Sequence, residues 1–500
     1  MRKFLLAGVA AIALAPAGVR AQSTEGAIPD QVQGYGESSG LDTLVPATDA
    51  AASTGVAKTG DPVLDRLNEL EAKVAKLEAR NKELEDQATA TADRVEKVEV
   101  RAAKGVQINA PAPTFADVGG NFTFKPRGTL QIDYAGYNER AGAYDYSNGT
   151  DIRRARFGFD GTAFKAFKWR IEAEYVKGAV NLLDAYVSYG YKNWLLTVGQ
   201  QKAPYGLEAN TSDSFNTFLE RGMFTNAFGA VAAERRVGAT VAYQSDTFNA
   251  TVGVFGTGEA VQRSSVTPDE GYSLNGRVTW EPLFDTGKVI HVGASAFLAT
   301  NFDGNTLDIS DRPNVRVDGG RIVRAQITGT APAGGPQTGA KDATYIGAEA
   351  AAIFGPFSVQ GEYGHLSIDR YGNVSTVDFD GFYAFASYFL TGESRVIKNG
   401  VIDRQKPIKD FNPLTGDWGA WEIALRYDNL DVTDTGLSPL KREAETFTAA
   451  LNWYLNPHTK LLFNYIRFKG LNSPLVVAPV ATNGTTAKGD AFATRLHFDF

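Results

Sequence analysis

The sequence predicts an all-β transmembrane barrel of about 16 antiparallel strands, preceded by a short periplasmic α-helical coiled coil. Three observations predict this fold. Beyond residue 115, apolar and polar residues alternate with a period of two. No apolar run after the N-terminus is long enough for a membrane-spanning helix. The last strand ends in an aromatic residue, Phe500, and such an end commonly directs assembly of outer-membrane barrels.

The first 21 residues have the features of a secretory signal peptide. Arg2 and Lys3 form a positive start, 4–15 is a short apolar stretch, and small residues precede the expected cut after Ala21. Residues 22–60 are rich in Gly, Ser, Thr and Ala, which predicts a flexible linker. The chain contains no Cys, so it has neither disulfides nor a thiolate metal site.

Residues 61–100 carry a heptad pattern that predicts the coiled coil. Leu67, Leu70, Val74 and Leu77 occupy a and d positions, and Asn81 is a polar residue at an a position. Arg66 with Glu71, Lys73 with Glu78 and Arg80 with Glu85 are opposite charges at the flanking positions, which favours parallel self-association. The alternative is a helix packed on its own chain. The pattern does not decide between a dimer and a trimer.

A second linker is expected at 101–114, and the barrel at 115–500. Segments such as Trp169–Tyr175 and Trp421–Tyr427 alternate apolar and charged residues; a water-facing sheet would do the same. Sixteen candidate strands, a count that eighteen could replace, lie near 122–138, 151–162, 168–177, 181–190, 194–200, 234–244, 248–257, 270–281, 288–300, 343–354, 357–369, 375–390, 419–431, 443–455, 459–469 and 489–500. Short and long connections mostly alternate, with long ones at 201–233 and 301–342, and the 391–418 connection is long where a short one is expected.

Five segments resemble the phosphate-selective porins O and P of Gram-negative bacteria. They are DIRRARFG at 151–158, VGQQKAPYGLE at 198–208, FLERG at 218–222, YFLTGE at 388–393 and NWYLNP at 452–457. The resemblance implies a 16-stranded, usually trimeric outer-membrane barrel, with a long third loop folded inward to narrow the pore. The segment at 201–233 occupies the place of that loop.

Alternation also predicts which side chains line the interior, and basic side chains there favour anions. With the Phe, Tyr and Val positions outward, the pore-lining and anion-binding candidates on strands are Lys125, Arg127, Arg154, Arg156, Arg170, Arg236, Arg277 and Arg426, and the loop at 201–233 adds Lys202 and Arg221. The same phase turns many carboxylates inward, and the long loops contain Glu208, Asp213 and Glu220. Any single one of these arginines is therefore more often a structural part of the wall than of a selectivity filter.

The expected function is an outer-membrane porin that admits small hydrophilic solutes, with anions such as phosphate preferred. A non-selective porin and a structural tether using the coiled coil are the alternatives. The expected partners are outer-membrane lipids, further copies of the chain in a homotrimer, small anions, and the barrel-assembly machinery through Phe500. The mildly acidic balance of 50 basic and 57 acidic residues argues against nucleic acid. The four His residues lack metal-ligand spacing, so neither an enzyme nor a cofactor is expected.

Overall fold

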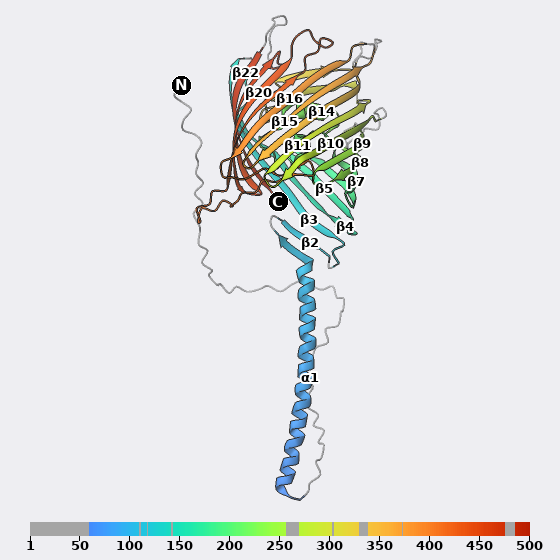
Figure 1. Ribbon diagram of the computed structural model, residues 1–500, viewed down its shortest axis with the longest axis vertical. Helices are drawn as coiled ribbons and strands as arrows, with labels where there is room; N and C mark the ends of the chain where they lie inside the picture. The colour runs from blue at the N-terminus through green and yellow to red at the C-terminus, as the bar shows by residue number, and fades with distance from the viewer. Residues whose placement is uncertain are drawn as a thin grey trace, which may run out of the picture. The chain divides into compact units, whose positions relative to one another are not determined.

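A computed structural model of the chain describes residues 60–109, 112–117, 119–141, 144–256, 270–302, 305–329, 339–372, 374–475 and 486–500 (Figure 1). The predicted signal peptide and most of the predicted 22–60 linker lie outside the described residues. The chain divides into two compact units, Met1–Gln87 and Ala88–Phe500.

The helical region is one long helix, α1 (Pro62–Gly105). The apolar a and d side chains in unit 1 are exposed: Leu70 by 49% and Leu77 by 65%. Within the single chain, the cations pair along their own helix, as Lys73 does with Glu69 at 2.6 Å, and not at the predicted interhelical positions. Among the described residues, no helix is both long and apolar enough to cross a membrane.

The prediction of a linker at 101–114 is wrong for the described part of that segment. Helix α1 continues to Gly105, and β1 (Val106–Asn109) pairs with β2 (Ala112–Ala116). Strand β2 in turn pairs with β3 through Phe115 opposite Phe124. The apolar residues Phe122, Phe124 and Pro126, at the start of the first predicted barrel strand, therefore belong to a longer extended region that begins with β1 and β2.

Eighteen strands form one sheet, and apart from the β1–β2 hairpin the other sixteen close into a barrel. The barrel strands are β3 (Thr123–Ala141), β4 (Gly149–Ala163), β5 (Phe167–Val176), β6 (Ala179–Tyr191), β7 (Trp194–Lys202), β8 (Arg235–Gln244), β9 (Phe248–Gly256), β10 (Tyr272–Asp285), β11 (Lys288–Thr300), β14 (Ala340–Phe354), β15 (Phe357–Arg370), β16 (Val377–Phe389), β19 (Ala420–Asp431), β20 (Glu443–Asn456), β21 (Thr459–Leu471) and β22 (Thr486–Asp499). Each pairs antiparallel with its neighbour in the chain, and β22 pairs with β3 to close the barrel, which confirms the predicted fold class.

Alternation places apolar side chains on the outer wall, as predicted. Ile171, Val198 and Val252 are each more than half exposed, although they are β-branched and apolar. Such a surface is stable only against hydrocarbon or another apolar surface, because exposing it to water has a large free-energy cost. The closing seam is tight at Phe500, whose backbone N–H donates to the Gly128 carbonyl at 3.0 Å. A Cβ on Gly128 would lie 2.5 Å from the Phe500 ring.

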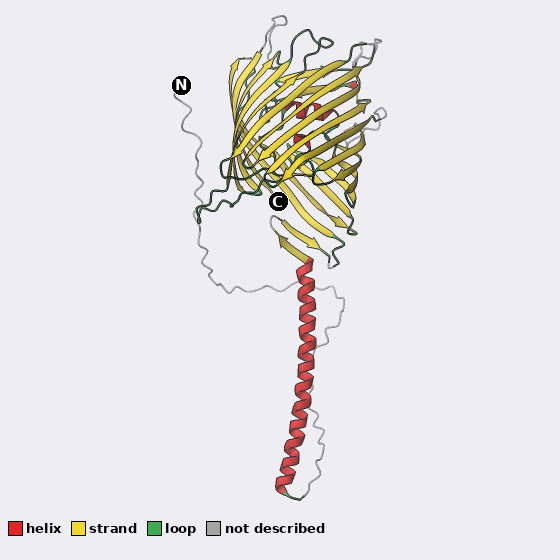
Figure 2. Ribbon diagram, in the orientation of Figure 1, coloured by secondary structure: helices red, strands yellow, loops and turns green. Residues whose placement is uncertain are grey.

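Two long connections contain small hairpins that alternation did not predict. Strand β12 (Leu307–Asp311) pairs with β13 (Val323–Ile327), and β17 (Ile397–Lys398) pairs with β18 (Val401–Ile402). Two short helices, α2 (Leu207–Asn210) and α3 (Met223–Ala232), lie in the connection between β7 and β8. Figure 2 shows these helices inside the barrel wall.

Candidate functional site

The connection at 203–234, between β7 and β8, folds into the barrel and is called the inward loop below. Phe218, Phe224 and Phe228 are at most 2% exposed, and they pack in the same core as inward-facing barrel residues such as Tyr383. Gly381 of β16 makes room for the loop, because a Cβ there would lie 2.2 Å from the Cβ of Phe224. The inward loop is therefore anchored by apolar packing as well as by charge.

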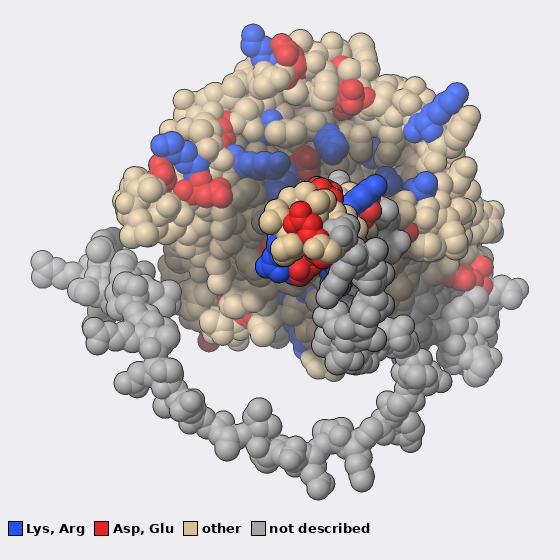
Figure 3. All heavy atoms as spheres, turned by 90° about the horizontal axis from the view of Figure 1, so that it is seen from below, with Lys and Arg blue, Asp and Glu red and all other residues tan. Residues whose placement is uncertain are grey.

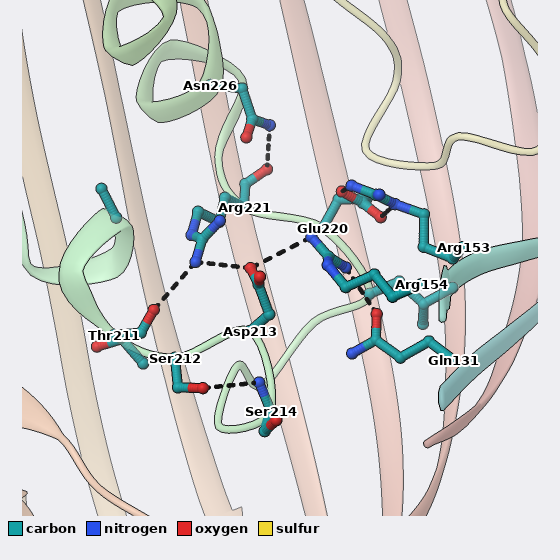
Figure 4. A network of polar contacts seen from close by, with 12 residues as sticks. Gln131, Arg153, Arg154, Thr211, Ser212, Asp213, Ser214, Glu220, Arg221 and Asn226 are labelled. Carbon is teal, nitrogen blue, oxygen red and sulfur yellow. Dashed lines mark hydrogen bonds and ion pairs between the residues drawn. The ribbon is translucent and has the colours of Figure 1, made fainter. Parts of the chain in front are cut away.

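The first charge cluster surrounds Asp213 of the inward loop (Figure 4). Its carboxylate lies 2.7 Å from Arg156, 3.2 Å from Arg154 and 2.7 Å from Arg221. Burial opposes the charged form of Asp213, but these guanidinium groups outweigh burial and hold its pKa well below the usual value. Asp213 therefore stays ionised and joins the loop to the β4 wall.

The second cluster surrounds Glu220, seven residues further along the same loop. Arg153 of β4 donates to both Glu220 oxygens, at 2.7 and 3.0 Å. Arg495 of β22 and Arg316 of the 301–339 connection lie 2.8 and 3.1 Å from the same carboxylate. As with Asp213, burial is outweighed by the arginines, so the pKa of Glu220 lies well below its usual value. Glu220 joins three separate parts of the interior.

A third set of contacts holds the start of α2. The backbone N–H groups of Leu207 and Glu208 donate to the Glu362 carboxylate of β15 at 2.8 and 2.6 Å. The Glu208 carboxylate accepts from the Gly222 N–H at 2.8 Å and lies 3.5 Å from Arg426 of β19. Burial raises the pKa of Glu208 above its usual value despite Arg426. Glu208 is thus more easily protonated than the other two loop carboxylates.

The connection at 301–339 also folds against the inward loop. Asn314 donates to Asp428 at 3.0 Å and to Thr446 at 2.5 Å, and Asn226 of α3 donates to Asp311 at 2.8 Å. Arg312 and Arg321 from this connection make no ion pair with a carboxylate among the described residues. Burial, followed by the neighbouring Arg321 and Arg316, lowers the pKa of Arg312. Its Nε atom is buried without a hydrogen-bond partner.

The charges around the two arginine clusters do not balance. Six arginines form ion pairs with five carboxylates here: Arg153, Arg154, Arg156, Arg221, Arg316 and Arg495 with Asp133, Glu174, Asp213, Glu220 and Asp311. Lys202, Arg312 and Arg321 lie beside them and make no ion pair among the described residues. Cations therefore outnumber carboxylates here, although the sequence of the long loops shows no such excess. On the face seen from below in Figure 3, basic and acidic residues are interspersed.

The structure brings four of the ten predicted residues together, namely Arg154, Arg156, Lys202 and Arg221. Lys202 donates to the backbone carbonyls of Ala209 and Thr211, at 2.9 and 3.4 Å, and not to a carboxylate. Arg426 lies apart from them, beside Glu208 and over the Phe218 ring at 4.4 Å. These residues all face the inward loop.

The other five predicted residues lie elsewhere. Arg127 and Arg170 share Asp160 at 3.3 and 3.5 Å. Arg236 donates to the carbonyls of Ala230 and Val231 at the end of α3. Arg277 pairs with Glu349 and donates to the Gly400 carbonyl at 2.7 Å. Lys125 is half-buried and has no hydrogen-bond or ion-pair partner among the described residues.

Several interior cations are absent from the predicted set. Arg395 of the 390–419 connection is buried and contacts Glu422 and, at 2.5 Å, Thr217. Lys460 of β21 donates to the Asn216 carbonyl at 2.9 Å. The inward phase of β21 would have identified Lys460, because Leu462 and Asn464 share it. Arg312 and Arg395 lie in irregular connections, where alternation has no meaning.

Comparison with known proteins places the chain in a family. The sequence profile of the family described as phosphate-selective porin O and P matches residues 124–500. An uncharacterised protein of Caulobacter vibrioides is 30% identical over 394 residues, which cover 76% of this chain and 75% of that protein. Porin O of Pseudomonas aeruginosa is 28% identical over 415 residues, which cover 76% of this chain and 89% of Porin O.

Solved structures that match include an anion-selective porin from Comamonas acidovorans and the outer membrane channel DcaP of Acinetobacter baumannii. The first is 16% identical with a TM-score of 0.46, and the match covers 75% of this chain and 100% of that one. The second is 12% identical with a TM-score of 0.45, covering 77% and 99%. On the family match and the closed sixteen-stranded barrel, the chain is an outer-membrane channel and belongs to the phosphate-selective porin O and P family.

Proposed function

We propose that the channel favours small anions such as phosphate over cations. The observation that carries this proposal is the excess of guanidinium groups around the inward loop, where Asp213 and Glu220 are each shared by three arginines. A carboxylate shared in this way neutralises only part of the positive charge around it. The remaining field lowers the free energy of an anion that enters and raises that of a cation.

Arg312 is the strongest single candidate for direct anion contact. Its buried Nε has no hydrogen-bond partner, and its charged neighbours are three arginines, Arg321, Arg316 and Arg153, and one carboxylate, Asp311. A buried donor without a partner costs free energy, and an oxyanion supplies the missing acceptor. Guanidinium groups suit phosphate because two N–H donors match two phosphate oxygens. Arg154, Arg156 and Arg221 contribute to the field, while their main contacts hold the loop.

We also propose that copies of the chain associate through α1, in a homotrimer with the helix on the periplasmic side. The exposed a and d residues of α1 support this, because a continuous apolar seam on an isolated helix is unfavourable in water. The Gram-negative outer membrane supplies lipid for the apolar outer wall, and Phe500 at the closing seam is the proposed contact for the assembly machinery. Signal-peptide removal after Ala21 belongs to the same proposal.

Chloride current through the purified channel, measured in planar bilayers during phosphate titration, tests the anion proposal. In the double variant Arg312→Gln/Arg321→Gln, we expect the half-blocking phosphate concentration to rise at least about fivefold, since a unit charge 4 Å away is worth about 1 kcal/mol in water. The control is Arg324→Gln in the same connection, because Arg324 is exposed and pairs with Asp308 at 2.6 Å. Equal block in both variants, or no block of the native channel, contradicts the proposal and leaves a non-selective porin.

A further inference from the structure

A row of basic residues lies on the outer wall of the barrel, away from the pore. It consists of Arg140 of β3, Arg467 and Lys469 of β21, and Lys488 of β22, and it is called the outer basic row below. Register places Lys469 opposite Lys488 and Arg467 opposite Asp490. The neighbouring Ile466 and Phe468 are buried inward, so the alternation of β21 turns Arg467 and Lys469 outward. Strand β21 lies between β20 and β22, which are labelled in Figure 1.

The outer basic row borders a surface hollow of about 450 Å³. The carboxylates at the hollow do not neutralise the row. Arg140 and Arg467 both approach Asp490, the second at 3.8 Å, and Lys469 lies 3.5 Å from Glu445 of β20. Lys488 is exposed and has no ion-pair or hydrogen-bond partner among the described residues. Four cations therefore face two carboxylates, and Asp490 is further occupied by the Tyr465 hydroxyl at 2.8 Å.

Directly beside the row, four adjacent strands present exposed aromatic side chains. They are Tyr427 of β19, Phe447 of β20, Tyr465 of β21 and Phe492 of β22, which are 40–50% exposed. Tyr465 stands two residues from Arg467, and Phe492 stands two residues from Asp490 on the same outer face. Outer-membrane barrels have such aromatic girdles where the apolar band meets the lipid headgroups. The outer basic row therefore lies at headgroup level.

The row lies at the barrel end opposite Phe500. Lys488 is the third residue of β22, which starts at Thr486 and runs toward Phe500. Strands β3 and β21 end there too, at Ala141 and Leu471. Phe500 lies beside the short turn at His458, and short turns of outer-membrane barrels are periplasmic, so in this proposal the end with the row faces the outer leaflet.

We propose that the outer basic row and its hollow bind the phosphate groups of a phosphorylated membrane lipid, with the acyl chains against the aromatic girdle. Lysine and arginine side chains at this level make charge-assisted hydrogen bonds to headgroup phosphates. The adjoining aromatic and apolar wall is continuous with the lipid-facing surface, which a free anion would not use. The binding site needs only the barrel in a bilayer, and its assignment to the outer leaflet rests on the proposed function.

Lipid retention by the full chain tests this inference. The purified protein in detergent is mixed with bisphosphorylated lipid A or with dephosphorylated lipid A of the same acyl composition, and bound lipid is measured by native mass spectrometry. We expect the double variant Arg467→Gln/Lys488→Gln to lose about tenfold in affinity for the phosphorylated lipid. The matched control is Lys165→Gln/Lys192→Gln, which removes two exposed charges in turns at the opposite end. Glu445→Gln, which removes a carboxylate from the hollow, is expected to increase retention.

Three results would overturn the inference. They are equal affinity of the double variant and the control, equal binding of both lipids by the native chain, and displacement of the lipid by millimolar inorganic phosphate, which would indicate a site for free anions. Heat-modifiable migration on gels establishes that each variant is folded, and the single variants Arg467→Gln and Lys488→Gln serve if the double variant is not. Because conductance is not measured here, failure of the lipid site is distinguishable from failure of the anion-channel proposal.

Discussion

At the scale of single residues, the arginines of the interior have two roles: some position the inward loop, and others are proposed to contact anions. Arg153 and Arg495 bind Glu220 and so position the inward loop, whereas Arg312 makes no such contact. The sequence identifies which arginines in regular strands face inward. It does not identify their partners, because those come from residues far apart in the chain: Arg495 and Glu220 are 275 positions apart.

The variant Glu220→Gln tests whether Glu220 opposes anion binding through its charge or supports it by holding the arginines in place. Removing one negative charge from this arginine cluster should strengthen anion binding; a unit charge at about 4 Å is worth about 1 kcal/mol in water, so phosphate should block at up to about fivefold lower concentration. Chloride current in planar bilayers measures this, with Asp308→Asn as the control, because Asp308 forms an exposed ion pair with Arg324. Weaker block in Glu220→Gln would mean that Glu220 serves anion binding by holding the arginines in place.

The loop carboxylates also predict the dependence on pH. Because the pKa values of Asp213 and Glu220 are depressed, their stabilisation is present above the ordinary carboxyl pKa of about 4 and is lost only as the pH falls further. The contacts of Asp213 and Glu220 should therefore persist from pH 7 to about pH 4.5. Any change of conductance in this range is expected from Glu208, whose pKa is raised, and from the wall carboxylates Glu362 and Asp428, which accept from backbone N–H groups of the inward loop. A transition between pH 4.5 and pH 7 that disappears in Glu220→Gln would contradict this assignment.

At the scale of elements, the barrel strands were predictable and the connections were not. The predicted strand at 288–300 coincides with β11, and the one at 357–369 differs from β15 by one residue. A period of two follows from burial of one face, so it survives in any strand between lipid and interior. Strand β13 does alternate between buried and exposed residues, but the β12–β13 and β17–β18 hairpins have strands of only five and two residues, too short to stand out within long connections.

Helix α1 carries a prediction at this scale. The chain contains no Cys, so Leu77→Cys introduces a single thiol at a d position, and Ala79→Cys introduces one at an outward f position. In the full chain reconstituted in vesicles, a short bifunctional maleimide should join copies efficiently in Leu77→Cys and poorly in Ala79→Cys. Equal cross-linking of the two would contradict a specific seam, and the size of the linked product reports whether the assembly is a dimer or a trimer.

At the scale of the whole molecule, an apolar outer wall encloses an interior that is charged, packed and partly occupied by its own loops. The closed sheet leaves no open edge in the barrel, since β22 pairs with β3. The sequence predicts this architecture because every strand repeats the same alternation. The gathering of arginines around Asp213 and Glu220 is a property of the folded molecule, since it arises only when the 203–234 and 301–339 connections converge on β4 and β22.

The central claim is that this interior favours anions, and the zero-current potential of the native channel across a KCl gradient tests it most directly. If the interior favours anions, the zero-current potential will have the sign expected when chloride is more permeant than potassium. The magnitude of that potential should fall when phosphate occupies the channel. A potential of the sign set by potassium would contradict the account, because the field around Asp213 and Glu220 would then be too weak to select.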